Sequence, residues 1–142
     1  MTLRDISIDA LLPHRGRMRL IEEIIEVDDT GAVTLATAAG HWPFFNDQNV
    51  HSLVCIELVA QTAGISNSWG GILKHGNDFN NRGWLVGIKS AVFFMDTIPL
   101  HTLITTRTRN QFEYEGYREI LGTVEIGSNT IAEVRLQLMQ SE

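Results

Sequence analysis

Three residues in one short segment could carry acid–base chemistry on a carbonyl substrate. His41 and His51 precede Glu57 by sixteen and six residues, and Glu57 interrupts an apolar run. A carboxylate removed from water without partners is costly, so Glu57 must be paired, protonated or in contact with a wet cavity. A histidine and a carboxylate together could move protons to and from a bound substrate. A structural ion pair between Glu57 and an arginine is the alternative.

The element that carries Glu57 is predicted to be a helix over residues 52–74. This segment is too long for a strand and lacks strict alternation. It is apolar almost all round, which is typical of a helix enclosed by its domain. At 3.6 residues per turn, its polar and small residues stack along one side: Glu57, Gln61, Gly64 and Ser68.

The start of this helix is a candidate oxyanion site. Helix N-termini present unpaired N–H groups and a partial positive charge. We therefore expect Ser52 and Leu53, together with Gln61, to bind the substrate.

The rest of the chain has strand character apart from a short helical turn that Pro13 ends. Residues 17–27 and 31–39 are predicted to form a hairpin through the turn sequence DDTG. Four strands follow the helix, and the last of them alternates strictly between apolar and polar residues, which favours an antiparallel sheet. These strands are predicted at residues 84–93, 101–115, 117–127 and 130–140.

This order of elements predicts an α+β fold in which a curved antiparallel sheet wraps a long central helix. The length of 142 residues indicates one domain over residues 1–142. A long edge strand needs cover, and pairing with a second copy supplies it, so we expect at least a dimer.

Composition excludes several classes of protein. A net charge of −6 and the lack of a dense basic run argue against nucleic acid. The lone Cys55 excludes a disulfide framework and a zinc cluster, which favours the cytoplasm. No apolar segment approaches the roughly 20 residues that span a bilayer. We expect no metal and no redox cofactor, because the histidine spacing matches no zinc motif and Gly70-Gly71 lacks a dinucleotide fingerprint.

Three stretches in the same order resemble a known family. They are LLPHRGRMRLIEEI, IELVAQTAG and LVGIKSAVFFMDTIPLHTLI, and together they touch most of residues 11–105. They are similar to the hot-dog-fold 3-hydroxyacyl-[acyl-carrier-protein] dehydratases, in particular the divergent branch associated with aryl-polyene-type lipid pathways.

The resemblance implies a hot-dog dimer that binds an acyl group on the phosphopantetheine arm of acyl carrier protein. In this family a histidine removes the C2 proton, a helix carboxylate protonates the departing C3 hydroxyl, and helix N-terminal amides polarise the carbonyl. Glu57 matches the carboxylate residue for residue. The motif GHWP makes His41 the first candidate for the base, although its distance to Glu57 is two residues longer than in the family. His51 is the second candidate, because it lies nearer the helix and replaces the first residue of the usual Pro-Gly.

The resemblance also implies that His14 and Arg15 line the mouth of the acyl tunnel, with a purely structural segment as the alternative. Acyl carrier protein and either a second copy or another hot-dog subunit are the implied partners, and the protein itself needs no cofactor. Two other functions stay open: a catalytically silent subunit that pairs with an active dehydratase, and a hot-dog acyl thioesterase.

Overall fold

A computed structural model describes residues 8–12, 18–75 and 83–140 of the chain. Two helices and nine strands occur in these ranges. In chain order they are α1 (Ile8–Leu11), β1 (Glu23–Val27), β2 (Gly31–Thr37), β3 (Phe45–Asn46), β4 (Asn49–His51), α2 (Val54–His75), β5 (Gly83–Phe93), β6 (Thr97–Pro99), β7 (Leu103–Tyr114), β8 (Tyr117–Ile126) and β9 (Asn129–Gln140).

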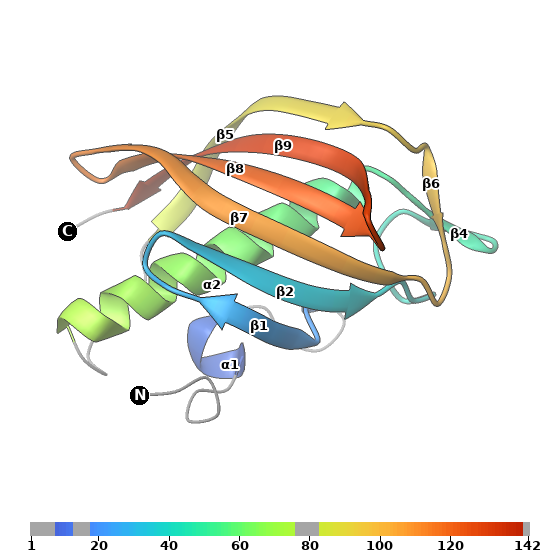
Figure 1. Ribbon diagram of the computed structural model, residues 1–142, viewed down its shortest axis with the longest axis horizontal. Coiled ribbons are helices and arrows are strands. Elements are labelled where there is room, and N and C mark those ends of the chain that lie inside the picture. Colours follow the sequence, from blue (N-terminus) through green and yellow to red (C-terminus); the bar gives the residue numbers. More distant parts are fainter. Residues whose placement is uncertain (1–7, 13–17, 76–82, 141–142) are drawn as a thin grey trace.

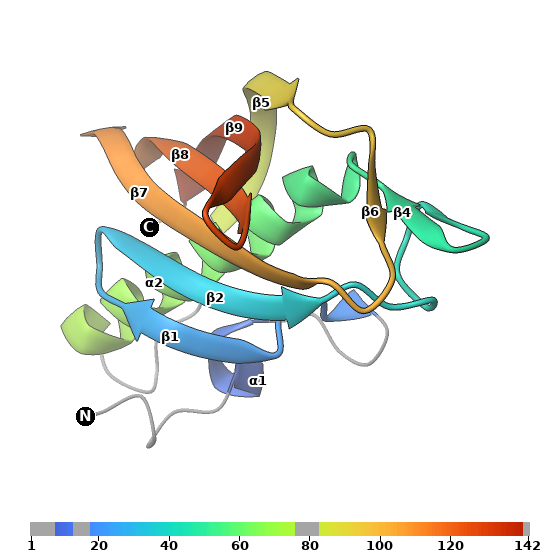
Figure 2. The same ribbon diagram turned by 45° about the vertical axis from the view of Figure 1, so that its right-hand side comes forward.

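The main layer is a six-stranded sheet in the order β1-β2-β7-β8-β9-β5. All of its ladders are antiparallel, and the sheet curves over α2 (Figure 1). The predicted α+β fold, with a long central helix wrapped by a curved antiparallel sheet, is confirmed. A second sheet of β3, β4 and β6 lies beyond the N-terminal end of α2 (Figures 1 and 2) and was not predicted.

The predicted hairpin at the start of the sheet is confirmed. The Asp28 carboxylate closes the turn by accepting hydrogen bonds from the amide and hydroxyl of Thr30, at 2.8 and 2.7 Å, and from the Gly31 amide at 2.9 Å. The bonds from Thr30 hold the pKa of Asp28 below its ordinary value of 3.8. The first strand begins at Glu23 rather than at residue 17.

Helix α2 is enclosed, as its apolar pattern predicts, and it lies in close contact with the sheet at Gly122. Leu58 and Val59 are fully buried. A Cβ atom at Gly122 would lie 2.3 Å from Cγ1 of Val59, closer than atoms can approach. Glycine at this point of β8 therefore lets the sheet lie directly on the helix. Nearby, the buried hydroxyls of Thr62 and Thr34 bond to each other at 2.8 Å, which satisfies polar groups inside the core.

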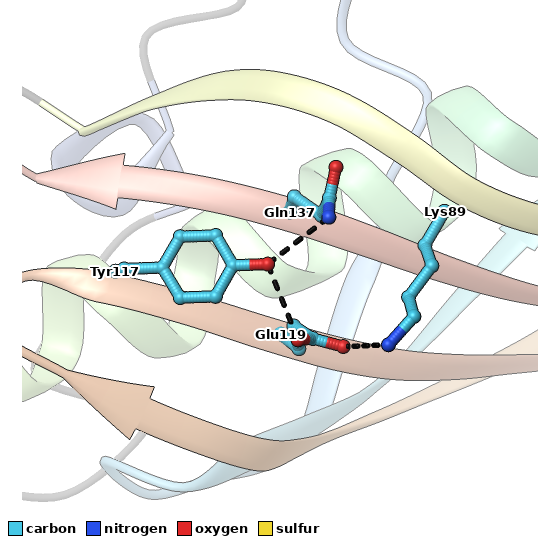
Figure 3. Close-up of polar contacts among 4 residues, drawn as sticks. All are labelled: Lys89, Tyr117, Glu119 and Gln137. Carbon is cyan, nitrogen blue, oxygen red and sulfur yellow. Dashed lines mark hydrogen bonds and ion pairs between the residues drawn. The ribbon is translucent and has the colours of Figure 1, made fainter.

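A polar network lies on the outer face of the sheet. Figure 3 shows four side chains on the face away from α2 that join β5, β8 and β9. Lys89 donates to Glu119 at 2.6 Å, Tyr117 donates to Glu119 at 3.2 Å, and Gln137 donates to Tyr117 at 3.0 Å. The bond from Lys89 lowers the pKa of Glu119. These contacts link β5, β8 and β9, and the ion pair among them is partly exposed, so it contributes little to stability.

Strand β5 forms one edge of the sheet, and several of its apolar side chains are exposed. Val86 is 56% exposed, and three further side chains on β5 are exposed in the same way: Leu85, Ile88 and Val92. An apolar edge strand of this length is a surface that proteins normally cover. In the described part of the chain, no helix is long and apolar enough to cross a membrane.

Candidate active site

Glu57 lies in the first turn of α2, and Gln61 holds its carboxylate from one turn further on. The Gln61 amide nitrogen donates to Oε1 of Glu57 at 2.9 Å and to the carbonyl of Met18 at 2.8 Å. The Gln61 amide oxygen accepts from the backbone N–H of Leu20 at 2.9 Å. Gln61 is 0% exposed, so it fixes Glu57 and the 18–20 segment together. Its predicted contact with substrate stays a prediction.

Glu57 and His41 line the same cavity. It has a volume of about 450 Å³, within the range of roughly 300–1,000 Å³ that small-molecule sites occupy. The residues of the described ranges that line it are Met18, Leu20, His41, Pro43, Phe44 and Glu57. The structure therefore brings His41, the first candidate for the base, and the Glu57 carboxylate to one largely apolar pocket.

A well-anchored loop presents His41. The next residue, Trp42, is buried, and its amide donates to the carbonyl of Ala39 at 3.1 Å. The strand before the loop is tied to the β6–β7 connection, because Ala38 exchanges backbone hydrogen bonds with His101 and Thr102 at 2.8 and 3.0 Å. His41 itself is exposed on this loop, where its imidazole can meet a ligand.

His51, the second candidate, has a different environment. It ends β4, and its Nδ1 accepts the backbone N–H of Leu53 at 3.0 Å. In this arrangement the imidazole caps the start of α2, and a neutral ring carries its proton on Nε2. His51 is absent from the residues that line the cavity with Glu57.

The residues at the start of α2 are held by the connection between β5 and β6. Ser52 is buried, its hydroxyl donates to the carbonyl of Met95, and its amide donates to the carbonyl of Asp96 at 3.0 Å. The amides of Ser52 and Leu53 are thus both engaged within the chain. His14 and Arg15 lie outside the described residues.

Cys55, two residues before Glu57, is a poor candidate for a nucleophile. Burial raises the pKa of the Cys55 thiol to about 12, so a thiolate nucleophile is disfavoured. Among the residues that the structure describes, no three His, Cys, Asp or Glu side chains gather in a way that could hold a metal ion.

Among the described residues that line the cavity, four were not predicted from the sequence: Met18, Leu20, Pro43 and Phe44. Pro43 ends the GHWP motif and Phe44 follows it, so the motif could have indicated both. Met18 and Leu20 reach the cavity through the long-range hydrogen bonds to Gln61, which no local pattern reveals.

The class of protein follows from this architecture. A long helix wrapped by a curved antiparallel sheet is the hot-dog fold, here with an acidic residue of the helix and a loop histidine at one pocket. A solved structure, the dehydratase heterocomplex ApeI:P from Xenorhabdus doucetiae, has the same fold: its TM-score is 0.83 at 20% identity, and the match covers 96% of this chain and 92% of that chain.

The sequence comparisons define the family. Residues 6–142 match the ApeP-like family, described as ApeP dehydratase. The chain is 31% identical over 116 residues to the 3-hydroxyacyl-[acyl-carrier-protein] dehydratase FabZ of Streptococcus pyogenes serotype M5 (strain Manfredo), covering 76% of each protein. It is 33% identical over 110 residues to FabZ of Streptococcus uberis, covering 72% of this chain and 73% of that protein. The chain belongs to the ApeP-like dehydratase family.

Proposed function

We propose that the protein converts a 3-hydroxyacyl thioester on acyl carrier protein into the trans-2-enoyl thioester and water. The observation that carries this proposal is the shared cavity of His41 and Glu57. The names of the FabZ relatives, which are 3-hydroxyacyl-[acyl-carrier-protein] dehydratases, support the same substrate class.

The proposed reaction uses one base and one acid. Neutral His41 takes the C2 proton, which the thioester makes acidic, and the electrons of that C–H bond form the C2=C3 double bond. As the C3–O bond breaks, protonated Glu57 gives its proton to the departing hydroxide, which leaves as water. Gln61 acts on Glu57 by fixing the direction of the carboxylate. Loss of a proton from His41 and return of one to Glu57 restore the starting state.

His41 is favoured over His51 as the base on two grounds. His41 lines the cavity with Glu57, and the Nδ1 lone pair of His51 is already used by the Leu53 amide. A neutral His51 in this arrangement has no ring nitrogen left to accept the substrate proton.

The test is an assay of enoyl product from a 3-hydroxyacyl thioester on carrier protein. We expect Glu57→Gln and His41→Ala each to lower turnover by at least about 100-fold. Matched controls are Glu125→Gln, which removes an ion pair with Arg107 on the outer face, and His101→Ala, which removes an exposed histidine. Normal turnover by Glu57→Gln would exclude the proposed acid, and loss of turnover in His51→Ala but not in His41→Ala would move the base to His51.

We further propose that β5 pairs with another hot-dog subunit, either a second copy or a different chain. The exposed apolar side chains of this edge strand support the pairing, and the neighbour from Xenorhabdus doucetiae is by its description a heterocomplex. The alternative function is that of a catalytically silent subunit, which would pair with an active dehydratase in such a complex.

The mass of the purified protein in solution, measured with and without a co-expressed dehydratase, tests the pairing. We expect a dimeric mass in at least one of these preparations, and a monomeric mass after Val86→Glu because a charge would enter the apolar contact. A monomer in both preparations would contradict the pairing. If the dehydratase turns over only in the mixed complex, and Glu57→Gln in this chain leaves that turnover unchanged, this chain is the silent subunit.

A further inference from the structure

Phe44, which follows the GHWP motif, has a backbone conformation that bulky residues rarely adopt. Its φ angle is +64°, in the left-handed region. Outside glycine, this region is enriched in asparagine and aspartate, and a bulky side chain there is an outlier that costs free energy. Phe44 therefore occupies a position where glycine would be the easier residue.

The conformation of Phe44 is fixed by its neighbours. Its carbonyl accepts the amide of His51 at 3.0 Å. The next residue, Phe45, pairs with Val50 in the β3–β4 ladder. The ring of Phe45 also lies 3.8 Å from the place that a Cβ of Gly40 would take. These contacts hold the segment on both sides of Phe44.

Phe44 lines the cavity that contains His41 and Glu57, and the residue is 51% exposed. Burial in a core thus does not explain a phenyl group at a strained position. Strained backbone kept at the edge of a functional cavity points to a role for the side chain it presents.

We propose that Phe44 is a specificity-determining residue, whose ring limits the bulk of the acyl group that the cavity accepts beside His41 and Glu57. This inference rests on the proposed function, because it assumes that the cavity takes an acyl group. Removal of the ring enlarges the cavity at one wall and leaves both proposed proton-transfer groups in place.

The test combines Phe44→Ala and Phe44→Gly with a series of 3-hydroxyacyl thioesters of increasing bulk. We expect the ratio of kcat/KM for bulky over small acyl groups to rise at least about tenfold in both variants, the scale of discrimination that small volume changes cause in apolar pockets. We also expect Phe44→Gly to melt a few degrees higher than Phe44→Ala. Both variants lack the ring, but only glycine relieves the left-handed backbone.

His101 provides the matched control. Its φ angle is +67°, it is exposed, and it does not line the cavity. His101→Gly should therefore melt above His101→Ala, as at position 44, while the substrate ratio of both variants stays at the wild-type value. An unchanged ratio in the two Phe44 variants would overturn the proposal.

Binding of acyl-pantetheine amides, measured by calorimetry over the same series, separates this proposal from the proposed function. If the wild-type protein binds the amides but dehydrates no thioester, the proposed reaction is wrong, and the change in binding profile between wild type and Phe44→Ala still decides the role of Phe44. If the wild-type protein binds none of the amides, the cavity takes no acyl group and both proposals are wrong.

Discussion

Replacement of Gln61 by methionine should be strongly destabilising, although the two side chains have similar volumes. Gln61 is fully buried and makes three hydrogen bonds, to Leu20, Met18 and Glu57. With Glu57 protonated, as the proposed reaction requires, each bond joins neutral groups and contributes about 1 kcal/mol, so their sum is about 3 kcal/mol. With an unfolding entropy of about 0.3 kcal/mol/K for a chain of this size, Gln61→Met should melt about 10 °C below wild type.

Thermal unfolding followed by circular dichroism measures this effect, and Gln137→Met supplies the control. Gln137 donates one hydrogen bond, to the hydroxyl of Tyr117, on the half-exposed outer face. Its loss should cost less than about 1 kcal/mol, or about 3 °C. If Gln61→Met melts no lower than Gln137→Met, the three bonds of Gln61 do not tie the 18–20 segment to the helix, and the account of how Glu57 is held is wrong.

Three further predictions concern the core, the turn and the thiol. Gly122→Ala should lower the free energy of unfolding by about 1–3 kcal/mol, because the new methyl group collides with Val59. In a double-mutant cycle, Val59→Ala should recover part of this loss. Purely additive changes in the free energy of unfolding would refute the contact. The lowered pKa of Asp28 implies stabilisation of the folded state that is present above pH 3.8 and is lost as the pH falls through the folded pKa. The difference in Tm between wild type and Asp28→Asn should therefore shrink on acidification. A constant difference would contradict this prediction. Cys55 is buried and its pKa is raised to about 12, so it should resist alkylation at neutral pH in the folded protein and react fully in denaturant. Rapid labelling of the native protein would contradict this prediction, because it would show that the thiol is accessible.

The sequence predicted the elements whose signals are local. Helix α2 and the long strands β7, β8 and β9 have the expected type and nearly the expected bounds, because each has a sustained hydrophobic period. The small sheet was not predicted, because β3, β4 and β6 are only two or three residues long. In addition, β4 pairs with β6 although α2 and β5 lie between them in the sequence. Pairing of such short strands depends on tertiary contacts rather than on composition.

The start of β1 shows why strand bounds are harder to predict than strand type. Leu20 and Ile21 are apolar and buried, so the pattern extends the strand to them. The Leu20 amide instead donates to the Gln61 side chain, which takes this residue out of the ladder. A hydrogen bond across 41 positions of sequence has no local signature.

The candidate site was predictable in part. An acidic residue in an apolar helix and the GHWP motif indicated Glu57 and His41, and the structure brings both to one cavity. Sequence spacing alone could not separate His41 from His51, because the outcome depends on which way each imidazole points. The hydrogen bond from the Leu53 amide to Nδ1 of His51 depends on that orientation, and it is one reason why we propose His41 as the base.

Hydration of an enoyl thioester in heavy water is the sharpest measure of proton transfer by His41 and Glu57, because the reverse reaction delivers one deuteron to C2. We expect the wild-type protein to yield 3-hydroxyacyl thioester with deuterium at C2, and His41→Ala and Glu57→Gln to yield no more of it than a sample without protein. Full deuterium incorporation by either variant would contradict proton transfer by this pair of residues.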